Sequence, residues 1–389
     1  MPIVAVRARP KYRCVTLCRD TSRGDLAMST TPSTDNRPPL ALGLFMPNCS
    51  NSPSISTYKP KPDDWTFESN LKISWAAESA GFEFLFPIAK WRGFGGVTNV
   101  FGTSLETMTW ASAILARTSR IKVFSTVHVP IFHPLMAAKM GGTLDHIGNG
   151  RWGLNVVSGW SEHEFGMMGI EVIPHDERYQ RTEAYVEILK GLWTSPPGTF
   201  NHSSKWYKIT DGWVSPLPVS KPHPPIANAG MSEDAKHMVA RLCDWAFISL
   251  RESAEAAPVS ANLREQARNH GRTIKISTYP MVLWADTERE AEQERRKLVE
   301  QLDVVAAERW ARGLSDKSGS FDRCTLEMFA IGAGALPIVG TAEQAAEQIA
   351  GLYRMGIDGL LMCFLDYYKD TLRFDREISP LLRQMDVIR

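Results

Sequence analysis

The chain has 389 residues, of which 43% are hydrophobic and 22% charged, and its formal net charge at pH 7 is +1. This composition is typical of a globular protein with a large core, and the scattered charges argue against a basic nucleic-acid-binding face. No apolar run approaches the roughly 20 residues needed to span a bilayer, so we expect neither nucleic acid nor a membrane as a partner.

The N-terminal stretch differs in composition from the rest. Residues 1–27 are rich in arginine, and Met28 is followed by STTPSTDNRPP, which is typical of a disordered linker. A transit-like leader, a disordered tail and an upstream start codon ahead of Met28 are the open alternatives. We expect a dispensable extension over residues 1–38 and one folded domain over residues 39–389.

The spacing of the six cysteines has no pattern typical of disulfide pairs, which indicates reduced thiols and a cytoplasmic protein. Cys14 and Cys18 lie four residues apart, but no second pair follows at the spacing of a zinc finger. We therefore predict no metal site.

From Leu40 onward, segments with the pattern of buried strands alternate with segments of helical period. Gly81 is placed to end the first helix, and Ser104 is placed to cap the second. The expected strands are 40–47, 82–88, 121–130, 151–157, 224–230, 244–250, 274–285 and 358–365. The expected helices are 65–81, 104–120, 134–150, 178–193, 232–243, 260–272, 286–312 and 342–356, followed by a closing helix.

This alternation indicates an α/β fold, a (β/α)8 TIM barrel. A doubly wound sheet is the alternative, but it would not need eight repeats. The stretches 194–224 and about 312–340 break the rhythm, and we expect insertions there at the C-terminal face of the strands. In TIM barrels this face carries the chemistry.

The segment RWGLNVVSGW, residues 151–160, places an amide inside an apolar strand. If the strand runs from Arg151 to Val157, Asn155 points into the barrel near its top. A buried amide without a hydrogen bond costs about 1 to 3 kcal/mol. Asn155 is therefore expected to have a partner, and a polar ligand is one candidate.

Four motifs carry a resemblance to a known family: GRWGLNVVSGWSEHEFGMMGI, KWRGFGG, HDERYQRTEAYVEILKGLW and AGMSEDA. These motifs come in the family's order along the chain, and over about residues 40–389 the chain resembles the bacterial-luciferase-like flavin-dependent monooxygenases. The resemblance is to the branch that holds pyrimidine monooxygenase, the dimethylsulfone and alkanesulfonate monooxygenases and riboflavin lyase.

The resemblance implies a two-component enzyme. A separate NAD(P)H:flavin reductase would supply reduced FMN (FMNH2), and the barrel would bind it, use O2 and oxygenate a small organic substrate in catabolism. It also implies a homodimer or homotetramer. The flavin would do the redox chemistry, and the protein would hold it in place.

The family's flavin contacts correspond to seven positions of this chain: Ala89, Lys90, Asn155, Glu164, Arg178, Tyr179 and Ser232. Each of three positions also has a purely structural interpretation. Lys90 would be a charge on the rim, Asn155 a hydrogen-bonded core amide, and Arg178 part of a surface salt bridge with Asp176 or Glu177. Ser232 is expected to cap a helix, alone or together with binding the FMN phosphate.

The resemblance also places Thr126 and Asn155 beside the flavin face where O2 is captured, so both are candidate catalytic residues. His128 is a third candidate, for substrate contact or for proton transfer near neutral pH. Each also has a simpler interpretation, Thr126 as an ordinary strand residue and His128 as a loop histidine.

The substrate is the least determined feature. The polar and aromatic mix of Trp91, Phe132, His133 and Trp160 suits a planar N-heterocycle, pyrimidine-like or riboflavin-like. A sulfone or sulfonate is the alternative, although few arginines other than Arg92 and Arg178 stand at the mouth. A deazaflavin-dependent hydride-transfer oxidoreductase and a flavin-binding protein without catalysis also remain open.

Overall fold

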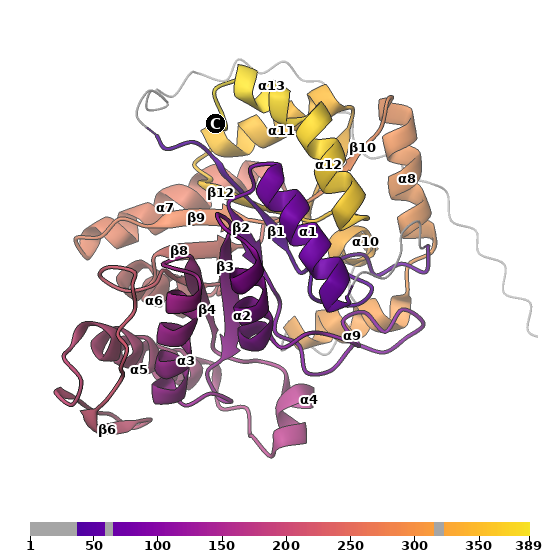
Figure 1. Ribbon diagram of the computed structural model, residues 1–389. Coiled ribbons are helices and arrows are strands. Elements are labelled where there is room, and N and C mark those ends of the chain that lie inside the picture. Colours follow the sequence, from indigo (N-terminus) through magenta and orange to yellow (C-terminus); the bar gives the residue numbers. More distant parts are fainter. Residues whose placement is uncertain (1–36, 59–64, 315–322) are drawn as a thin grey trace, which may run out of the picture. The chain divides into compact units, whose positions relative to one another are not determined.

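Eight parallel strands close into a barrel in the computed structural model of the chain, which describes residues 37–58, 65–314 and 323–389 (Figure 1). The strands follow one another around the barrel in the order β1-β12-β9-β8-β7-β4-β3-β2. Their bounds are β1 Ala41–Phe45, β2 Phe84–Phe86, β3 Lys122–His128, β4 Trp152–Val157, β7 Ile226–Asn228, β8 Trp245–Ile248, β9 Lys275–Thr278 and β12 Gly359–Met362. The predicted TIM barrel is confirmed, and its closure rules out the doubly wound sheet.

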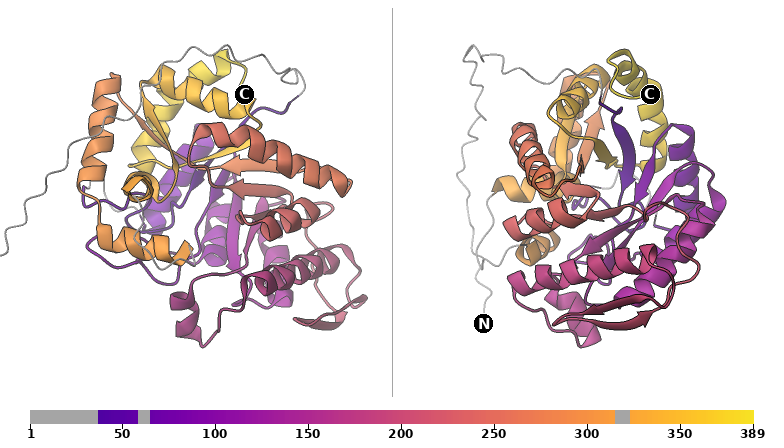
Figure 2. Two further views of the ribbon diagram at one scale, coloured as in Figure 1. Left: turned by 180° about the vertical axis from the view of Figure 1, so that it is seen from behind. Right: turned by 90° about the vertical axis from the view of Figure 1, so that its left-hand side faces the viewer.

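The helices that connect these strands lie outside the barrel (Figure 2). Gly81 has a φ of +79° just after the first helix, as expected of a residue that ends a helix. The connecting helices are α1 Phe67–Ser79, α2 Thr107–Arg117, α3 Pro134–Ile147, α4 Glu162–Phe165, α5 His175–Thr194, α6 Glu233–Leu242, α7 Ala256–Asn269 and α11 Ala342–Arg354, and α12 Tyr367–Glu377 and α13 Ser379–Gln384 close the chain.

Side chains alternate along each strand between the barrel interior and the layer of helices. On β3, Val123 and Val127 belong to the core between strands and helices, whereas Phe124 belongs to the core inside the barrel. Aromatic rings fill that interior, and the ring centroids of Phe86 and Phe124 lie 4.9 Å apart. Thr126 and His128 share the inward face with Phe124, above this aromatic layer.

The stretch 274–285 is two strands rather than the single one expected. β9 stays in the barrel, while β10 (Pro280–Trp284) pairs in parallel with β11 (Leu336–Gly340) in a separate two-stranded sheet. Proline lacks an N–H donor, so Pro280 is tolerated at the first position of a strand. The run of apolar residues therefore concealed a change of sheet.

The expected helix 286–312 is also divided, into α8 (Glu288–Glu300) and α9 (Val304–Leu314). Asp303 starts the second helix, because its carboxylate accepts the N–H of Ala306 at 3.2 Å. The predicted cap of α2 is wrong in detail. Glu106 caps that helix, and the hydroxyl of Ser104 donates instead to the carbonyl of Lys90 at 2.7 Å.

The two irregular stretches contain regular structure. Residues 194–224 include the hairpin of β5 (Phe200–Ser203) and β6 (Lys208–Gly212), and residues 312–340 include α10 (Arg323–Gly332) and β11. The predicted extension, residues 1–38, lies outside the described residues except at its end. Among the described residues, no helix has the length and apolar character needed to cross a bilayer.

Candidate active site

Thr126 and Asn155 are direct neighbours across β3 and β4, at the polar end of the barrel interior. The Thr126 hydroxyl lies 2.8 Å from the carbonyl of Pro87 and must donate to it, because a carbonyl only accepts. The same oxygen must then accept from Asn155, whose Nδ2 lies 3.3 Å away. This chain of donors fixes the orientation of the Asn155 amide.

The amide oxygen of Asn155 is consequently turned away from Thr126. Asn155 is 4% exposed, and its Oδ1 is buried without a hydrogen-bond partner among the described residues. In the described part of the chain, the hydrogen-bond partner expected for Asn155 is therefore present for its amide nitrogen but not for its amide oxygen. An unsatisfied buried acceptor costs about 1 to 3 kcal/mol and suits a ligand that brings an N–H or O–H donor.

Lys90 and Glu164 form a buried ion pair between the loop after β2 and helix α4. Lys90 Nζ lies 2.8 Å from Glu164 Oε2, and both side chains are at most 5% exposed. The ammonium also lies 4.5 Å from the ring centre of Phe94 and 5.4 Å from that of Trp160. Lys90 is therefore not a solvated charge on the rim.

Burial opposes the charge on both members of this pair, and their mutual attraction opposes burial. The pKa of Lys90 is lowered, because desolvation outweighs the attraction of Glu164. Desolvation also acts on Glu164, but the Lys90 charge, the Lys90 hydrogen bond and the Trp91 amide together hold the pKa of its carboxyl below the usual value.

His128 ends β3 and contacts the loop that carries Lys90. The indole Nε1 of Trp91 donates to His128 Nδ1 at 3.3 Å. Burial lowers the pKa of His128 to about 4, so the imidazole is neutral at pH 7. This environment therefore suits the His128 imidazole to hydrogen bonding rather than to proton transfer near neutral pH.

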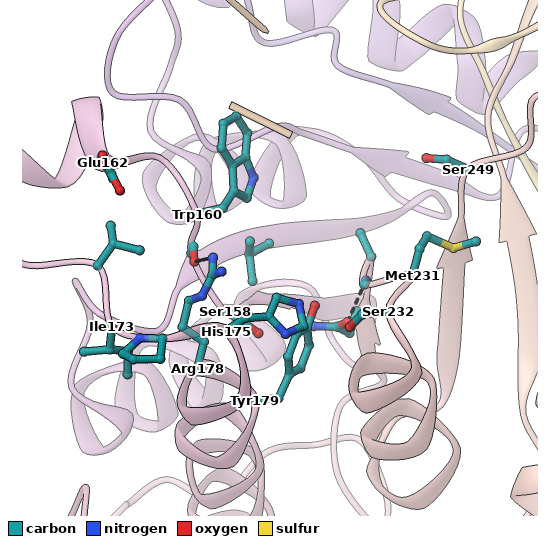
Figure 3. A pocket seen from close by; sticks show the side chains of 17 residues that line it. Ser158, Trp160, Glu162, Ile173, His175, Arg178, Tyr179, Met231, Ser232 and Ser249 are labelled. Atoms are coloured by element: carbon teal, nitrogen blue, oxygen red, sulfur yellow. Dashed lines mark hydrogen bonds between the residues drawn. The ribbon is translucent and has the colours of Figure 1, made fainter. Parts of the chain in front are cut away.

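A cavity of about 730 Å³ opens beside this cluster, at the C-terminal ends of β4, β7 and β8 (Figure 3). Trp160 borders both, because it contacts Lys90 and also lines the cavity. The cavity is also lined by Ser158, His175, Arg178, Tyr179, Gly230 and Ser232. The predicted flavin contacts on α5 and before α6 thus converge on one space.

Arg178, Tyr179 and Ser232 form one end of the cavity, where α5 and α6 begin (Figure 3). Arg178 Nη1 donates to the carbonyl of Gly159 at 3.0 Å, and its buried Nε lacks a partner among the described residues. The described carboxylates include none that forms a salt bridge with Arg178. Glu177, one of the two suggested partners, binds Lys205 instead.

Ser232 caps α6, because its hydroxyl accepts the N–H of Ala235 at 3.2 Å. The hydroxyl of Tyr179 interacts with those of Ser232 and Ser158, and burial raises the pKa of Tyr179. An arginine, two serines and a helix N-terminus at one place favour an anion.

Gly230 and Asn228 complete this end and were not identified from the sequence. Asn228 donates to the carbonyl of Val156 at 2.6 Å and accepts the N–H of Gly230 at 2.8 Å. A Cβ on Gly230 would lie 2.4 Å from the Cβ of Ala235 and 2.6 Å from the Tyr179 hydroxyl. The signal available in the sequence was Asn-Ala-Gly at the end of a strand, which is a turn pattern.

The four predicted substrate residues fall into two groups. Trp91 and Trp160 lie at the ion pair, and Trp160 also lines the cavity. Phe132 packs against the core between strands and helices, and the exposed His133 caps α3 by accepting the N–H of Leu135 at 3.2 Å. Ala89 lies in the loop between β2 and Lys90 and is partly buried.

Comparisons with known proteins agree with this architecture. Residues 42–359 match the family described as luciferase-like monooxygenases. The FMNH2-dependent dimethylsulfone monooxygenase of Pseudomonas putida is 29% identical over 357 residues, covering 90% of this chain and 96% of that protein. Pyrimidine monooxygenase RutA of Pseudomonas syringae is 31% identical over 355 residues, covering 88% and 96%.

Two solved structures share the fold at lower identity. A riboflavin lyase (RcaE) crystal structure has a TM-score of 0.81 at 21% identity, covering 90% of this chain and 93% of that chain. DmoA from Hyphomicrobium sulfonivorans has a TM-score of 0.79 at 20% identity, covering 91% and 90%. At these identities the likeness concerns the barrel and its connections.

Proposed function

Because the chain belongs to the luciferase-like monooxygenase family, we propose that it binds reduced FMN supplied by a separate NAD(P)H:flavin reductase and oxygenates a small organic molecule. The observation that carries the proposal is a pair of buried polar atoms without partners among the described residues, Asn155 Oδ1 and Arg178 Nε. One is an acceptor and the other a cationic donor, and reduced FMN offers ring N–H groups and a phosphate.

The phosphate would be held where α5 and α6 begin. Arg178 would supply the positive charge, and Ser232 and the first N–H groups of α6 would supply hydrogen bonds. Gly230 leaves the space in which a Cβ would contact Tyr179. This donor set fits a dianion better than a neutral ligand.

The ring would be held at the polar end of the barrel interior. Asn155 Oδ1 would accept an N–H of the ring, while the Thr126 hydroxyl keeps the amide from turning. When bound, reduced FMN would supply the electrons that reduce O2, with one oxygen atom entering the substrate and the other leaving as water. Trp160, which lines the cavity, would shield the bound ring from solvent on its side.

For the substrate we favour a planar N-heterocycle that is cleaved oxidatively. The rings of Phe94 and Trp160 lie against Lys90, and the indole of Trp91 lies close by at His128. This aromatic surface suits stacking on a flat ring. A sulfone is the second candidate, because dimethylsulfone monooxygenases are among the relatives at 29% and 30% identity.

The test is an anaerobic titration of the protein with oxidised and with reduced FMN. We expect tighter binding of the reduced form and a loss of about tenfold for Asn155→Ala, since one buried hydrogen bond is removed. The control is Asn262→Ala, the same change on the exposed face of α7. Arg178→Ala should weaken both redox forms, because it acts on the phosphate.

Failure to bind FMN in either redox state would overturn the cofactor assignment. Once binding is established, pyrimidines, riboflavin and dimethylsulfone are supplied separately under air with the reductase and NADH. Product that carries oxygen from ¹⁸O2 supports the monooxygenase. Turnover that proceeds equally well without O2 would instead support hydride transfer.

A further inference from the structure

The hydrogen bond between Trp91 and His128 restricts where the imidazole can carry its proton. An indole N–H only donates, so His128 Nδ1, at 3.3 Å, must be the unprotonated nitrogen. A neutral imidazole has one proton, which is then on Nε2. The other ring nitrogen of His128, Nε2, is therefore a hydrogen-bond donor.

We propose that Trp91 is a positioning residue that fixes His128 as the Nε2–H tautomer and so makes it a permanent hydrogen-bond donor at the rim of the barrel. The ligand atom that such a group recognises is an acceptor oxygen. The tautomer holds independently of any ligand. Its use in oxygenation rests on the proposed function.

Trp91 can do this because its backbone is held in place from α4. Glu164 Oε1 accepts the N–H of Trp91 at 2.7 Å and that of Arg92 at 3.2 Å, while Oε2 binds Lys90. Both carboxylate oxygens are therefore occupied by the protein. Glu164, expected as a direct flavin contact, serves here to hold three consecutive residues of the loop.

The surroundings of His128 favour the neutral ring. The charged groups that act on it are Glu164 and Lys90, which have opposite signs and opposite effects. The ring of Phe165 packs edge-on against it with centroids 5.6 Å apart, and Trp91 covers Nδ1. Desolvation is the largest influence, and it lowers the pKa of His128.

The position of His128 makes a donor useful there. It is the last residue of β3 and follows Thr126 on the same inward face, one step closer to the rim. A carbonyl of a heterocycle and an oxygen of a sulfone both accept hydrogen bonds. A donor at this point therefore serves either substrate class and does not depend on pH above the pKa of the ring.

The experiment measures the tautomer directly in the full-length protein without FMN. ¹⁵N spectra of histidine-labelled protein distinguish the two tautomers, and the signals of His128 are identified by their loss in His128→Asn. We expect the Nε2–H form with no titration between pH 6 and 8. Trp91→Phe keeps the ring but removes the donor, and should raise the Nδ1–H population on the order of threefold to tenfold.

Trp160→Phe is the matched control. It is the same change on the other indole beside Lys90, and this indole has no hydrogen bond to His128 in the described part of the chain. It should leave the tautomer unchanged, whereas Glu164→Ala should shift it partway, and thermal unfolding confirms that each variant is folded. A wild-type His128 that carries its proton on Nδ1, or an identical tautomer ratio in Trp91→Phe, would overturn the inference.

The two proposals can fail separately. A shifted tautomer in Trp91→Phe, in a protein that never binds FMN, would leave the role of Trp91 standing and remove the proposed function. FMN binding by a protein whose tautomer is unchanged in Trp91→Phe would leave the proposed function standing and remove the role of Trp91.

Discussion

The ammonium of Lys90 lies 2.8 Å from the carboxylate of Glu164, and neither side chain is more than 5% exposed. This pair joins the loop after β2 to the short helix after β4, which are far apart in the sequence. Because Glu164 also binds the N–H groups of Trp91 and Arg92, the pair determines the conformation of the loop beside the barrel rim.

Removing one member of the pair should destabilise the protein more than replacing both. Lys90→Met leaves a buried carboxylate without its cation, and we expect a loss of about 3 kcal/mol in the free energy of unfolding. Lys90→Met combined with Glu164→Gln should recover part of that loss, because no buried charge remains. Urea unfolding of the three proteins measures it, and an equal or larger loss in the double variant would contradict the interpretation.

Unfolding should depend on pH through His128. Its pKa is about 4 in the folded chain against 6.5 as its ordinary value, so below pH 6.5 the unfolded state binds the proton more readily. Stability should therefore be full above pH 6.5 and fall toward pH 4, by about 2 kcal/mol between pH 7.5 and pH 5. Urea unfolding at both pH values measures it.

His128→Asn is the control for this pH dependence, because burial also lowers the pKa of His223. The variant should lose the pH dependence of stability that is due to His128 and keep the pH dependence that is due to His223. The lowered pKa of Glu164 acts only below its usual value of 4.5, outside this window. A wild type and a variant with the same pH dependence would show that His128 titrates normally.

Thr126→Val should release the Asn155 amide. The substitution keeps the shape of the side chain but removes the hydroxyl that donates to Pro87 and accepts from Asn155. We expect a loss of about 1 to 3 kcal/mol in stability and weaker binding of reduced FMN. Thr126→Ser keeps the hydroxyl and should stay close to the wild type in both measurements.

Gly230→Ala should close the anion end of the cavity. The added methyl group would lie 2.6 Å from the Tyr179 hydroxyl, too close to be accommodated without a shift. FMN affinity should fall at least tenfold, as measured by fluorescence titration. Gly351→Ala is the control, since a Cβ there would meet no heavy atom within 4 Å beyond its chain neighbours and the backbone of α11, and it should stabilise α11 by about 0.5 to 1 kcal/mol.

Asp303→Asn should loosen the glycine-rich loop of residues 93–103, which contains Thr98, from α9. The buried carboxylate accepts the N–H and the hydroxyl of Thr98 at 2.7 and 2.9 Å and also caps α9. An amide would turn N–H groups toward one of these donors, at a cost of about 1 to 3 kcal/mol. Limited proteolysis of residues 93–103 should become faster, and unchanged cleavage would contradict this role.

Most of the barrel could be predicted from the sequence because its strands and helices repeat a local pattern. Gly81 and Ser232 show this at single positions, since the end and the cap of a helix depend on adjacent backbone groups. The strand 274–285 shows the limit. Its apolar composition suits both the barrel and the separate two-stranded sheet. Only the pairing with β11 shows that β10 belongs to the second sheet.

The sequence by itself determined the fold class, the family and the strand on which Asn155 lies. Only the tertiary structure decided what the polar side chains do, because their partners come from distant segments. It brings Glu164 to Lys90 and Trp91 to His128, and it places Phe132 and His133 at a core and at a helix cap. Local patterns record backbone preferences, whereas hydrogen bonds and charges depend on which segments the closed barrel places side by side.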